Sequence, residues 1–208
     1  MMTAYAGAPG GIDDARQLFD RMLLRNVVSW NVMVNGYVKA KRPEQALEVV
    51  RWMAEVGVRG TATTVVGAAT ACARLGRLRA GREVHCAFLR HFEDDNLLVW
   101  TTLVDMYAKC RRVFAARKVF DRLSMRNLVC WNAMIIGHCV YGEPYDGIKL
   151  FHEMIGPGGF RFPTFLLQTA TYCYICIFFI FLTPELPFQV RCNQMGSLSS
   201  VFSAPVLV

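Results

Sequence analysis

Charge is almost missing from residues 156–208 of this 208-residue sequence, where Arg161, Glu185 and Arg191 are the only charged side chains. The net charge of +7 therefore belongs almost entirely to the first 155 residues. A moderate basic excess favours polyanionic partners, such as nucleic acid or an anionic membrane surface, and it is also common in ordinary soluble proteins. Hydrophobic residues make up 54% of the chain, which excludes wholesale disorder.

Signals for export or import are also missing. Residues 1–19 contain no basic segment followed by an apolar one, which excludes a secretory signal peptide. Arg and Ser are absent from residues 1–15, and Asp13 and Asp14 come early, so the sequence predicts no transit peptide. The eight cysteines lie mostly inside apolar helical patterns, where a thiol behaves as a small hydrophobic group, and they favour a reducing compartment.

The sequence has little that suggests catalysis. The glycine-rich segment 7–11 lacks the Lys-Ser/Thr pair of a phosphate-binding loop. His91 and Glu93 match the H-x-E pattern of zinc deaminases, and Cys173 and Cys176 match C-x-x-C. Those cysteines, however, lack the preceding proline and lie in an uninterrupted apolar run, while His91 is expected at the end of a helix. We therefore expect no metal, no cofactor and no enzymatic activity of its own.

A duplication dominates what is present. Residues 15–37 and 116–138 align without a gap at an offset of 101, with 12 of 23 positions identical. Chance does not produce such a match, so the chain contains internal repeats. Two-helix patterns with apolar residues at helical spacing begin near four positions, which are separated by steps of 35, 35 and 31 residues: Val27, Ala62, Leu97 and Leu128.

Stacked helical hairpins are the fold that these repeats predict. No convincing β-strand pattern precedes residue 156, and a single hairpin cannot bury its own apolar stripe. The expected fold is all-α: a right-handed α-solenoid of helix-turn-helix repeats with an irregular apolar C-terminal tail. We assign residues 1–155 to the repeats, residues 156–208 to the tail, and the repeats to units 1–26 (partial), 27–61, 62–96, 97–127 and 128–155 (partial).

Several stretches, in order, resemble one repeat family. They read RNVVSWNVMVNGY (25–37), LVDMYAKC (103–110), ARKVFDRLSMRN (116–127) and LVCWNAMIIGH (128–138). They are similar to the pentatricopeptide repeat (PPR) family of land plants, and the order of unit lengths is similar to its PLS subclass. The signpost residues of the tetratricopeptide repeat are missing. The resemblance covers about residues 1–155.

This resemblance implies binding of single-stranded RNA at about one base per unit, read by the fifth and the last residue of each unit. Amides and hydroxyls there can hydrogen-bond a base edge, although Asn next to a helix start is also an ordinary cap. The implied base-reading residues are Asn31, Thr61, Val66, Asn96, Thr101, Asn127 and Asn132. The residues implied to sandwich the bases are Val28, Thr63, Leu98 and Val129. The implied RNA core is 5′-pyrimidine, any base, A, pyrimidine.

The same resemblance implies a role in organellar RNA processing or C-to-U editing, in a mitochondrion or a chloroplast. The chain would then be a recognition module, and a separate editing or processing factor would supply the catalysis. The alternative, from another class of protein, is a helical scaffold for protein–protein interaction. Polar groups at Asn31, Thr101 and Asn132 favour the RNA-binding interpretation, because a scaffold has no need for base-sized polar groups at one repeated position.

Basic residues concentrate in the segments 74–90 and 109–126, where they outnumber the acids. Cations repeated across neighbouring units can contact the phosphates of a bound strand. For Arg117, Lys118 and Arg122 we favour the simpler interpretation, in which they lie on solvated outer helix faces.

The tail has three interpretations. Residues 165–182 are uncharged over 18 positions, just long enough for a membrane-spanning helix, although Gln168 and three threonines weaken that interpretation, and membrane association is not expected. The tail can also be a disordered or aggregation-prone appendage. The abrupt end of the repeat pattern after residue 155 favours a third interpretation, translation of non-coding sequence. Since the first unit also begins part-way, we expect a fragment or a mis-spliced form of a longer protein.

Overall fold

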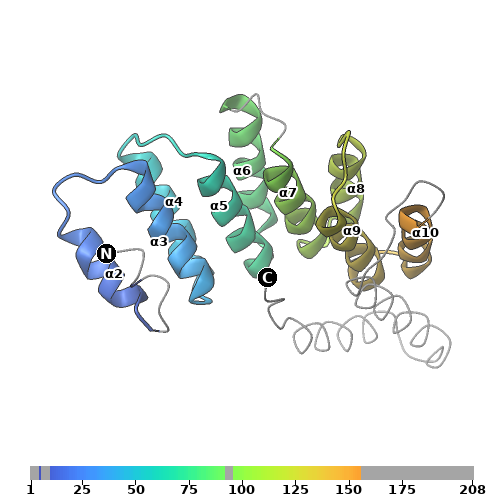
Figure 1. Cartoon of the computed structure of the whole chain (residues 1–208), viewed down its shortest axis with the longest axis horizontal. Helices are drawn as coiled ribbons and strands as arrows, with labels where there is room; N and C mark the ends of the chain where they lie inside the picture. Colours follow the sequence, from blue (N-terminus) through green and yellow to red (C-terminus); the bar gives the residue numbers. More distant parts are fainter. Residues whose placement is uncertain (1–4, 6–9, 92–95, 156–208) are drawn as a thin grey trace.

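A computed structural model describes residue 5, residues 10–91 and residues 96–155. All the regular secondary structure in these ranges is α-helical. Figure 1 shows the helices following one another in chain order, from α2 at one end to α10 at the other. Their bounds are α2 Ile12–Asp20, α3 Val27–Lys39, α4 Pro43–Glu55, α5 Ala62–Leu75, α6 Leu78–His91, α7 Leu97–Lys109, α8 Val113–Asp121, α9 Leu128–Tyr141 and α10 Pro144–Ile155.

The helices pack as a row of hairpins. Helix α3 packs on α4, α5 on α6, α7 on α8 and α9 on α10, which makes four two-helix hairpins. The first helices of the hairpins also pack on one another in sequence, α3 on α5, α5 on α7 and α7 on α9. Each hairpin thereby covers the apolar stripe of its neighbour, as a solenoid requires. The prediction of an all-α solenoid is confirmed.

A polar residue caps the N-terminus of each first helix. The side-chain oxygens of Asn26, Asn96 and Asn127 accept hydrogen bonds from backbone N–H groups in the first turns of α3, α7 and α9. Thr61 caps α5 in a reciprocal capping box with Thr64. These contacts satisfy N–H groups that have no partner inside the helix. They fix where the first helices begin, and hence which residues stand at equivalent positions in successive hairpins.

The turn inside three of the hairpins contains one residue in the left-handed region. Lys41 has φ 59°, Gly76 has φ 62° and Arg111 has φ 59°. These three residues occupy the same place, directly after the last turn of α3, α5 and α7. Only glycine adopts this conformation without a steric cost, so the turn is relaxed at Gly76 and strained at Lys41 and Arg111.

Close contact between the first helices depends on small residues. A Cβ atom added to Gly67 on α5 would lie 2.6 Å from the Val34 side chain on α3. A Cβ atom added to Gly137 on α9 would lie 2.8 Å from the Cβ of Ala108 on α7. Real Cβ atoms do not come this close, so glycine sets the spacing of the stacked helices and of the residues they carry.

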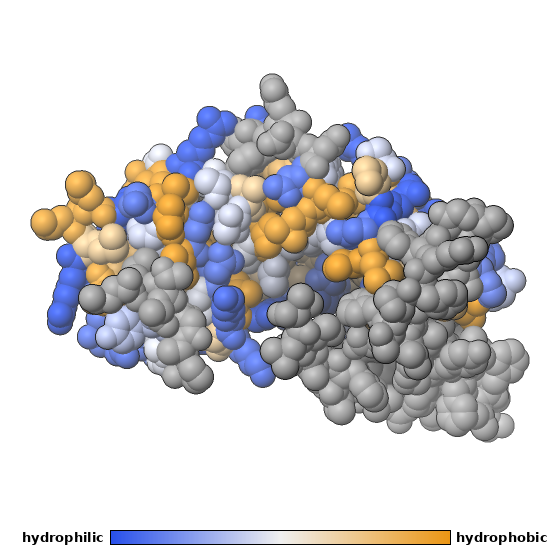
Figure 2. Space-filling model, in the orientation of Figure 1, coloured by the Kyte–Doolittle hydropathy of each residue, from blue (hydrophilic) through white to orange (hydrophobic). Residues whose placement is uncertain are grey.

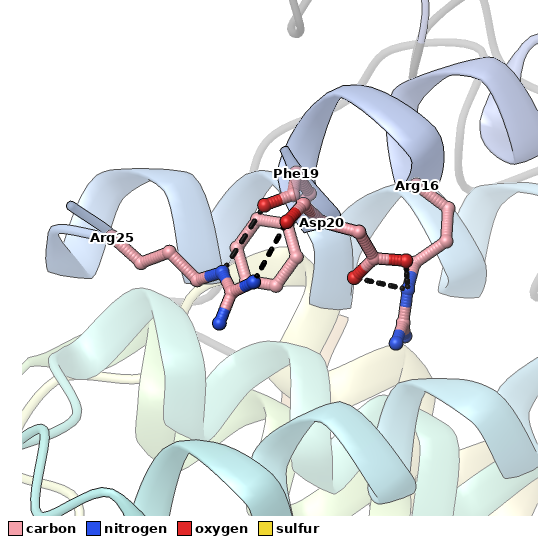
Figure 3. A network of polar contacts seen from close by, with 4 residues as sticks. All are labelled: Arg16, Phe19, Asp20 and Arg25. Carbon is pink, nitrogen blue, oxygen red and sulfur yellow. Dashed lines mark hydrogen bonds and ion pairs between the residues drawn. The ribbon is translucent and has the colours of Figure 1, made fainter. Parts of the chain in front are cut away.

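Four residues at the end of α2 and in the segment that leads to α3 form a group that we call the α2 clasp: Arg16, Phe19, Asp20 and Arg25 (Figure 3). The Arg25 guanidinium donates to the backbone carbonyls of Phe19 and Asp20, both at 3.1 Å, and so caps the C-terminal end of α2. It also lies 5.0 Å from the Phe19 ring centre. Arg16 and Asp20 form an ion pair at 2.8 Å on the same helix.

The duplication found in the sequence recurs in these contacts. At the offset of 101, Arg126 donates to the carbonyls of Phe120 and Asp121, at 3.2 and 3.5 Å, and lies 4.7 Å from the Phe120 ring centre. Arg117 pairs with Asp121 at 2.8 Å. This second clasp repeats, at the end of α8, the contacts that the first makes at the end of α2.

The predicted tail lies outside the described residues, and so does its uncharged stretch 165–182. Among the helices that the structure does describe, none combines the length and the apolar character needed to cross a membrane.

Candidate nucleic-acid interface

Four of the predicted base-reading residues lie on helices, and they stand at the same position in each of four stacked helices. Asn31, Val66, Thr101 and Asn132 are each the fifth residue of their helix, in α3, α5, α7 and α9 respectively. Because these helices pack successively, the four residues form a row that we call the reading row. The partner residues Thr61, Asn96 and Asn127 directly precede α5, α7 and α9, so each stands at the start of the helix next to its own.

Asn31 and Thr61 are brought together although they are 30 residues apart. The Asn31 Nδ2 group donates to the Thr61 Oγ1 atom at 2.9 Å. Thr64, which was not among the predicted site residues, joins them: its Oγ1 donates to Asn31 Oδ1 at 2.6 Å and accepts from the Thr61 backbone N–H at 2.9 Å. Thr64 is buried, and Asn31 and Thr61 are half-buried. We call these three residues the Asn31 network.

The second pair is apolar on one side. Val66 is half-buried and packs against the main hydrophobic cluster. Asn96 uses its Oδ1 to cap α7, with hydrogen bonds of 3.1 Å from the Leu98 N–H and 3.4 Å from the Val99 N–H. The cap leaves the Asn96 Nδ2 group as the only donor that this pair can offer a base, since valine has no polar atom.

The third pair is the least accessible. Thr101 is 5% exposed, and its hydroxyl donates to the Leu97 carbonyl at 2.7 Å, which leaves its oxygen as an acceptor. The Asn127 Oδ1 atom accepts from the Cys130 backbone N–H at 2.8 Å. Burial raises the pKa of the Cys130 thiol to about 11, against the opposite effects of Arg126 and of a hydrogen bond with Thr101. This pair therefore presents one acceptor and one amide donor.

Asn132 is the fourth residue of the row. It is half-buried on α9, and the final residue of its unit could not be recognised in the sequence, so no second reader is assigned to it.

The predicted sandwiching residues form a second row beside the first. Each is the second residue of its helix. Val28 is 62% exposed, Leu98 63% and Val129 57%, and Thr63 is also exposed. Exposed aliphatic side chains in three equivalent places are open to contact with a flat apolar surface such as the face of a base. Figure 2 shows the wider setting, with apolar and hydrophilic patches alternating across one face of the molecule.

The three cations on and directly after α8 each contact a neighbouring side chain. Arg117 pairs with Asp121. The Lys118 ammonium lies 4.8 Å from the ring centre of Phe114, and the Arg122 guanidinium lies 5.9 Å from that of Trp100. These contacts agree with the interpretation that the three cations belong to outer helix faces rather than to a phosphate-binding row.

The residues that match a deaminase pattern do not form a described site. His91 is the last residue of α6, whereas Glu93, Cys173 and Cys176 lie outside the described residues. In the ranges that the structure does cover, no group of three or more His, Cys, Asp or Glu side chains is arranged to hold a metal ion.

Thr64 and Cys130 are the site residues that sequence reasoning missed. Each is the third residue of its helix and touches the reading residue of the preceding unit. The spacing Thr61-x-x-Thr64 is that of a capping box, which is a recognisable sequence signal. That signal predicts the cap but not the contact with Asn31, because Asn31 comes from another hairpin.

Known proteins match the chain along most of the described part. Residues 25–74 match the PPR repeat family, and residues 98–128 and 129–158 each match the PPR repeat. The Arabidopsis thaliana protein "Pentatricopeptide repeat-containing protein At1g11290, chloroplastic" is 43% identical over 145 residues, which is 70% of this chain and 18% of that protein. A second protein of the same plant, "Putative pentatricopeptide repeat-containing protein At3g25060, mitochondrial", is 34% identical over 145 residues, which is 70% of this chain and 24% of that protein. The chain thus spans less than a quarter of either relative.

Solved structures share the fold. The crystal structure of the pentatricopeptide repeat protein PPR10 from maize superimposes with a TM-score of 0.71 at 18% identity, over 95% of this chain and 28% of that one. A PPR10 variant in complex with an 18-nucleotide PSAJ RNA element gives a TM-score of 0.66 at 18% identity, over 97% of this chain and 33% of that one. Together with the repeat matches, the stacked hairpins show that this chain belongs to the pentatricopeptide repeat family.

Proposed function

We propose that the chain is a sequence-specific binding module for single-stranded RNA, that it reads about one base per unit, and that it has no catalytic activity of its own. The observation that carries this proposal is the arrangement of equivalent residues: a row of reading residues across α3, α5, α7 and α9, beside a row of exposed residues that includes Val28, Leu98 and Val129. Hydrogen-bonding groups beside apolar ones suit a base, which has a polar edge and a flat face. The PPR10 variant bound to an RNA element has the same fold, which supports the proposal.

The reading units proposed are 27–61, 62–96 and 97–127, with partial units before and after them. The third unit illustrates the chemistry. Its acceptor, Thr101 Oγ1, and its amide donor, Asn127 Nδ2, complement the N6 amino group and the N1 atom of adenine. Val66 with Asn96 offers one donor and discriminates little. The proposed core therefore remains 5′-pyrimidine, any base, A, pyrimidine.

We also propose a wider role, which belongs to a protein of the full length of these relatives. The relatives named chloroplastic and mitochondrial support an organellar setting. Within such a protein of the PLS subclass, this module would position a transcript for RNA processing or C-to-U editing, and a separate factor would carry out the reaction.

Binding to short RNAs tests the proposal. One net hydrogen bond contributes about 1 kcal/mol, so four units should give a dissociation constant of about micromolar or weaker. Fluorescence anisotropy with the full 208-residue chain should show tighter binding to the proposed core than to a scrambled RNA of the same composition, and weaker binding as salt increases. Equal binding to both RNAs would contradict base reading. No binding at low salt by the folded chain would favour the protein–protein scaffold instead.

A double substitution tests the assignment of the third unit. Thr101→Asn with Asn127→Asp should move the preferred third base from A toward U, as the family resemblance implies for that pair. Selection of bound RNAs from a random pool, before and after the change, measures the preference. Circular dichroism must first show that the double variant is folded, because Thr101 is buried. An unchanged third base in a folded variant would remove these two residues from the reading row.

A further inference from the structure

We infer that Thr64 is a positioning residue for base recognition: its hydroxyl fixes which way the Asn31 carboxamide faces, and so decides what the first full unit offers to a base. This inference rests on the proposed RNA-binding function. It extends the reading set beyond the fifth and last residues of a unit, because Thr64 belongs to the unit that follows.

The direction of the hydrogen bonds carries the argument. The Thr64 oxygen accepts from the Thr61 backbone N–H, so the Thr64 hydrogen is available to donate, and it points to Asn31 Oδ1 at 2.6 Å. An amide nitrogen cannot accept that hydrogen. If the carboxamide turned over, the hydroxyl of a residue that is 6% exposed would lose its acceptor. An unpaired buried donor is costly, so one orientation of the Asn31 side chain is favoured.

The fixed orientation defines the groups that remain for a base. One Asn31 Nδ2 hydrogen is used on Thr61 Oγ1, at 2.9 Å, which leaves the second. Thr61 Oγ1 accepts that bond. It also lies 3.5 Å from Thr64 Oγ1, which is too long for a strong hydroxyl–hydroxyl bond, so the Thr61 hydrogen can turn outward to donate to a base. The pair thus presents two donors, which match two adjacent acceptors. Cytosine has such acceptors, at O2 and N3, whereas the corresponding edge of uracil places a donor between its acceptors.

Equivalent residues in the next units follow the same pattern. The third residue of each following first helix stands in the place of Thr64: Val99 for the unit of Val66, and Cys130 for the unit of Thr101. Where the reading residue is polar, the third residue carries a group that can hydrogen-bond: the Thr64 hydroxyl donates to Asn31, and a thiol, that of Cys130, follows the unit of Thr101. Where the reading residue is valine, the third residue is also valine.

The test compares two RNAs that carry the proposed core and differ only in cytosine or uracil at the first core base. With the full 208-residue chain, competition binding should favour cytosine about fivefold, the ratio that one net hydrogen bond supplies. Thr64→Val removes the hydroxyl but keeps the shape, and the ratio should fall to about one. Thr64→Ser keeps the hydroxyl and should restore the preference. Thr70→Val is the matched control on the same helix, since its hydroxyl donates to the Val66 carbonyl at 2.7 Å and to no part of the Asn31 network, and it should leave the ratio unchanged.

The outcomes separate the two proposals. Discrimination that persists in Thr64→Val would overturn the role of Thr64 and leave RNA reading intact, and so would failure of Thr64→Ser to restore it. A wild-type chain without any RNA preference would overturn both. A measurement without RNA covers the case in which Thr64→Val does not fold: in the wild-type chain, nuclear magnetic resonance should show one Asn31 side-chain conformation, in which the Nδ2 proton donated to Thr61 is protected from exchange with water. Rapid exchange of both protons would also overturn the inference.

Discussion

Replacement of Arg25 by Met should release helix α2 from the rest of the solenoid. The Arg25 guanidinium donates two hydrogen bonds of 3.1 Å to the last carbonyls of α2, and it lies 5.0 Å from the Phe19 ring centre and 4.8 Å from that of Trp52. Two net hydrogen bonds contribute about 2 kcal/mol. Two partly exposed cation–π contacts contribute about 1 kcal/mol together. The side-chain entropy that Met regains offsets about 1 kcal/mol, so the net loss is about 2 kcal/mol.

Hydrogen–deuterium exchange measures this loss where it occurs. In a solenoid each unit contacts only its neighbours, so α2 at the end of the described row can open without the others. A loss of about 2 kcal/mol corresponds to exchange about 30-fold faster in peptides that cover Ile12–Asp20. Peptides from Leu97–Lys109 should not change, because that helix packs on α5, α8 and α9, away from the end of the row that carries α2.

Arg16→Met is the matched control within the same clasp (Figure 3). Arg16 also lies over Trp52, at 5.1 Å, and it pairs with Asp20, but its guanidinium caps no backbone carbonyl in the described contacts. A partly exposed ion pair of this kind contributes less than about 1 kcal/mol. Exchange in α2 that accelerates as much in Arg16→Met as in Arg25→Met would refute the reasoning that the carbonyl cap holds the helix.

Three further predictions follow from the geometry. Lys41→Gly should stabilise the chain by about 0.5–1 kcal/mol and so raise its urea unfolding midpoint, because glycine adopts a left-handed conformation without strain. Gly76→Ala should destabilise the chain by a similar amount. Opposite changes in the midpoint would refute the strain at this turn. Burial is the largest cause that lowers the pKa of His85 and of His138 below the ordinary value of 6.5. The contribution of these neutral histidines to stability is therefore complete above pH 6.5, and it is lost as the pH falls through their pKa values in the folded state. The urea unfolding midpoint should therefore decrease as the pH is lowered from 7.5 to 5.5, and it should decrease less in His138→Leu. An equal decrease in the variant and the wild-type chain would show that His138 does not contribute. Gly137→Val should disrupt the stacking of α9 on α7 and cost more than about 2 kcal/mol, measured by the same unfolding, since its Cβ would meet Ala108 at 2.8 Å.

The proposed interface was only partly predictable. The position of each reading residue follows from the unit boundaries, and the structure places Asn31 beside Thr61 as the pairing of fifth and last residues implies. Their role as base readers remains a prediction. The burial of Thr101 could not be anticipated, because a threonine in the first turns of a helix is equally consistent with an exposed or a covered position. Its 5% exposure results from how α9 packs on α7.

The sequence by itself determined the solenoid. Helical periodicity, capping residues such as Asn26 and Asn127, and the 101-residue duplication are all local or repeated signals, and each acts within one hairpin or between identical ones. Local signals suffice for this fold because every hairpin packs mainly on its neighbours, so few distant contacts have to be inferred.

Only the tertiary structure decided what the repeated positions do. The contact between Asn31 and Thr64 joins residues 33 positions apart on different helices, and the stacking distance set by Gly67 brings those helices together. Trp52 likewise joins the α2 clasp from α4, although the duplication gives no sign of it, since Glu153 stands at the corresponding place in the second copy. Hydrogen bonds and ring contacts depend on distances of a few tenths of an ångström, and only the packing of one helix against the next fixes those distances.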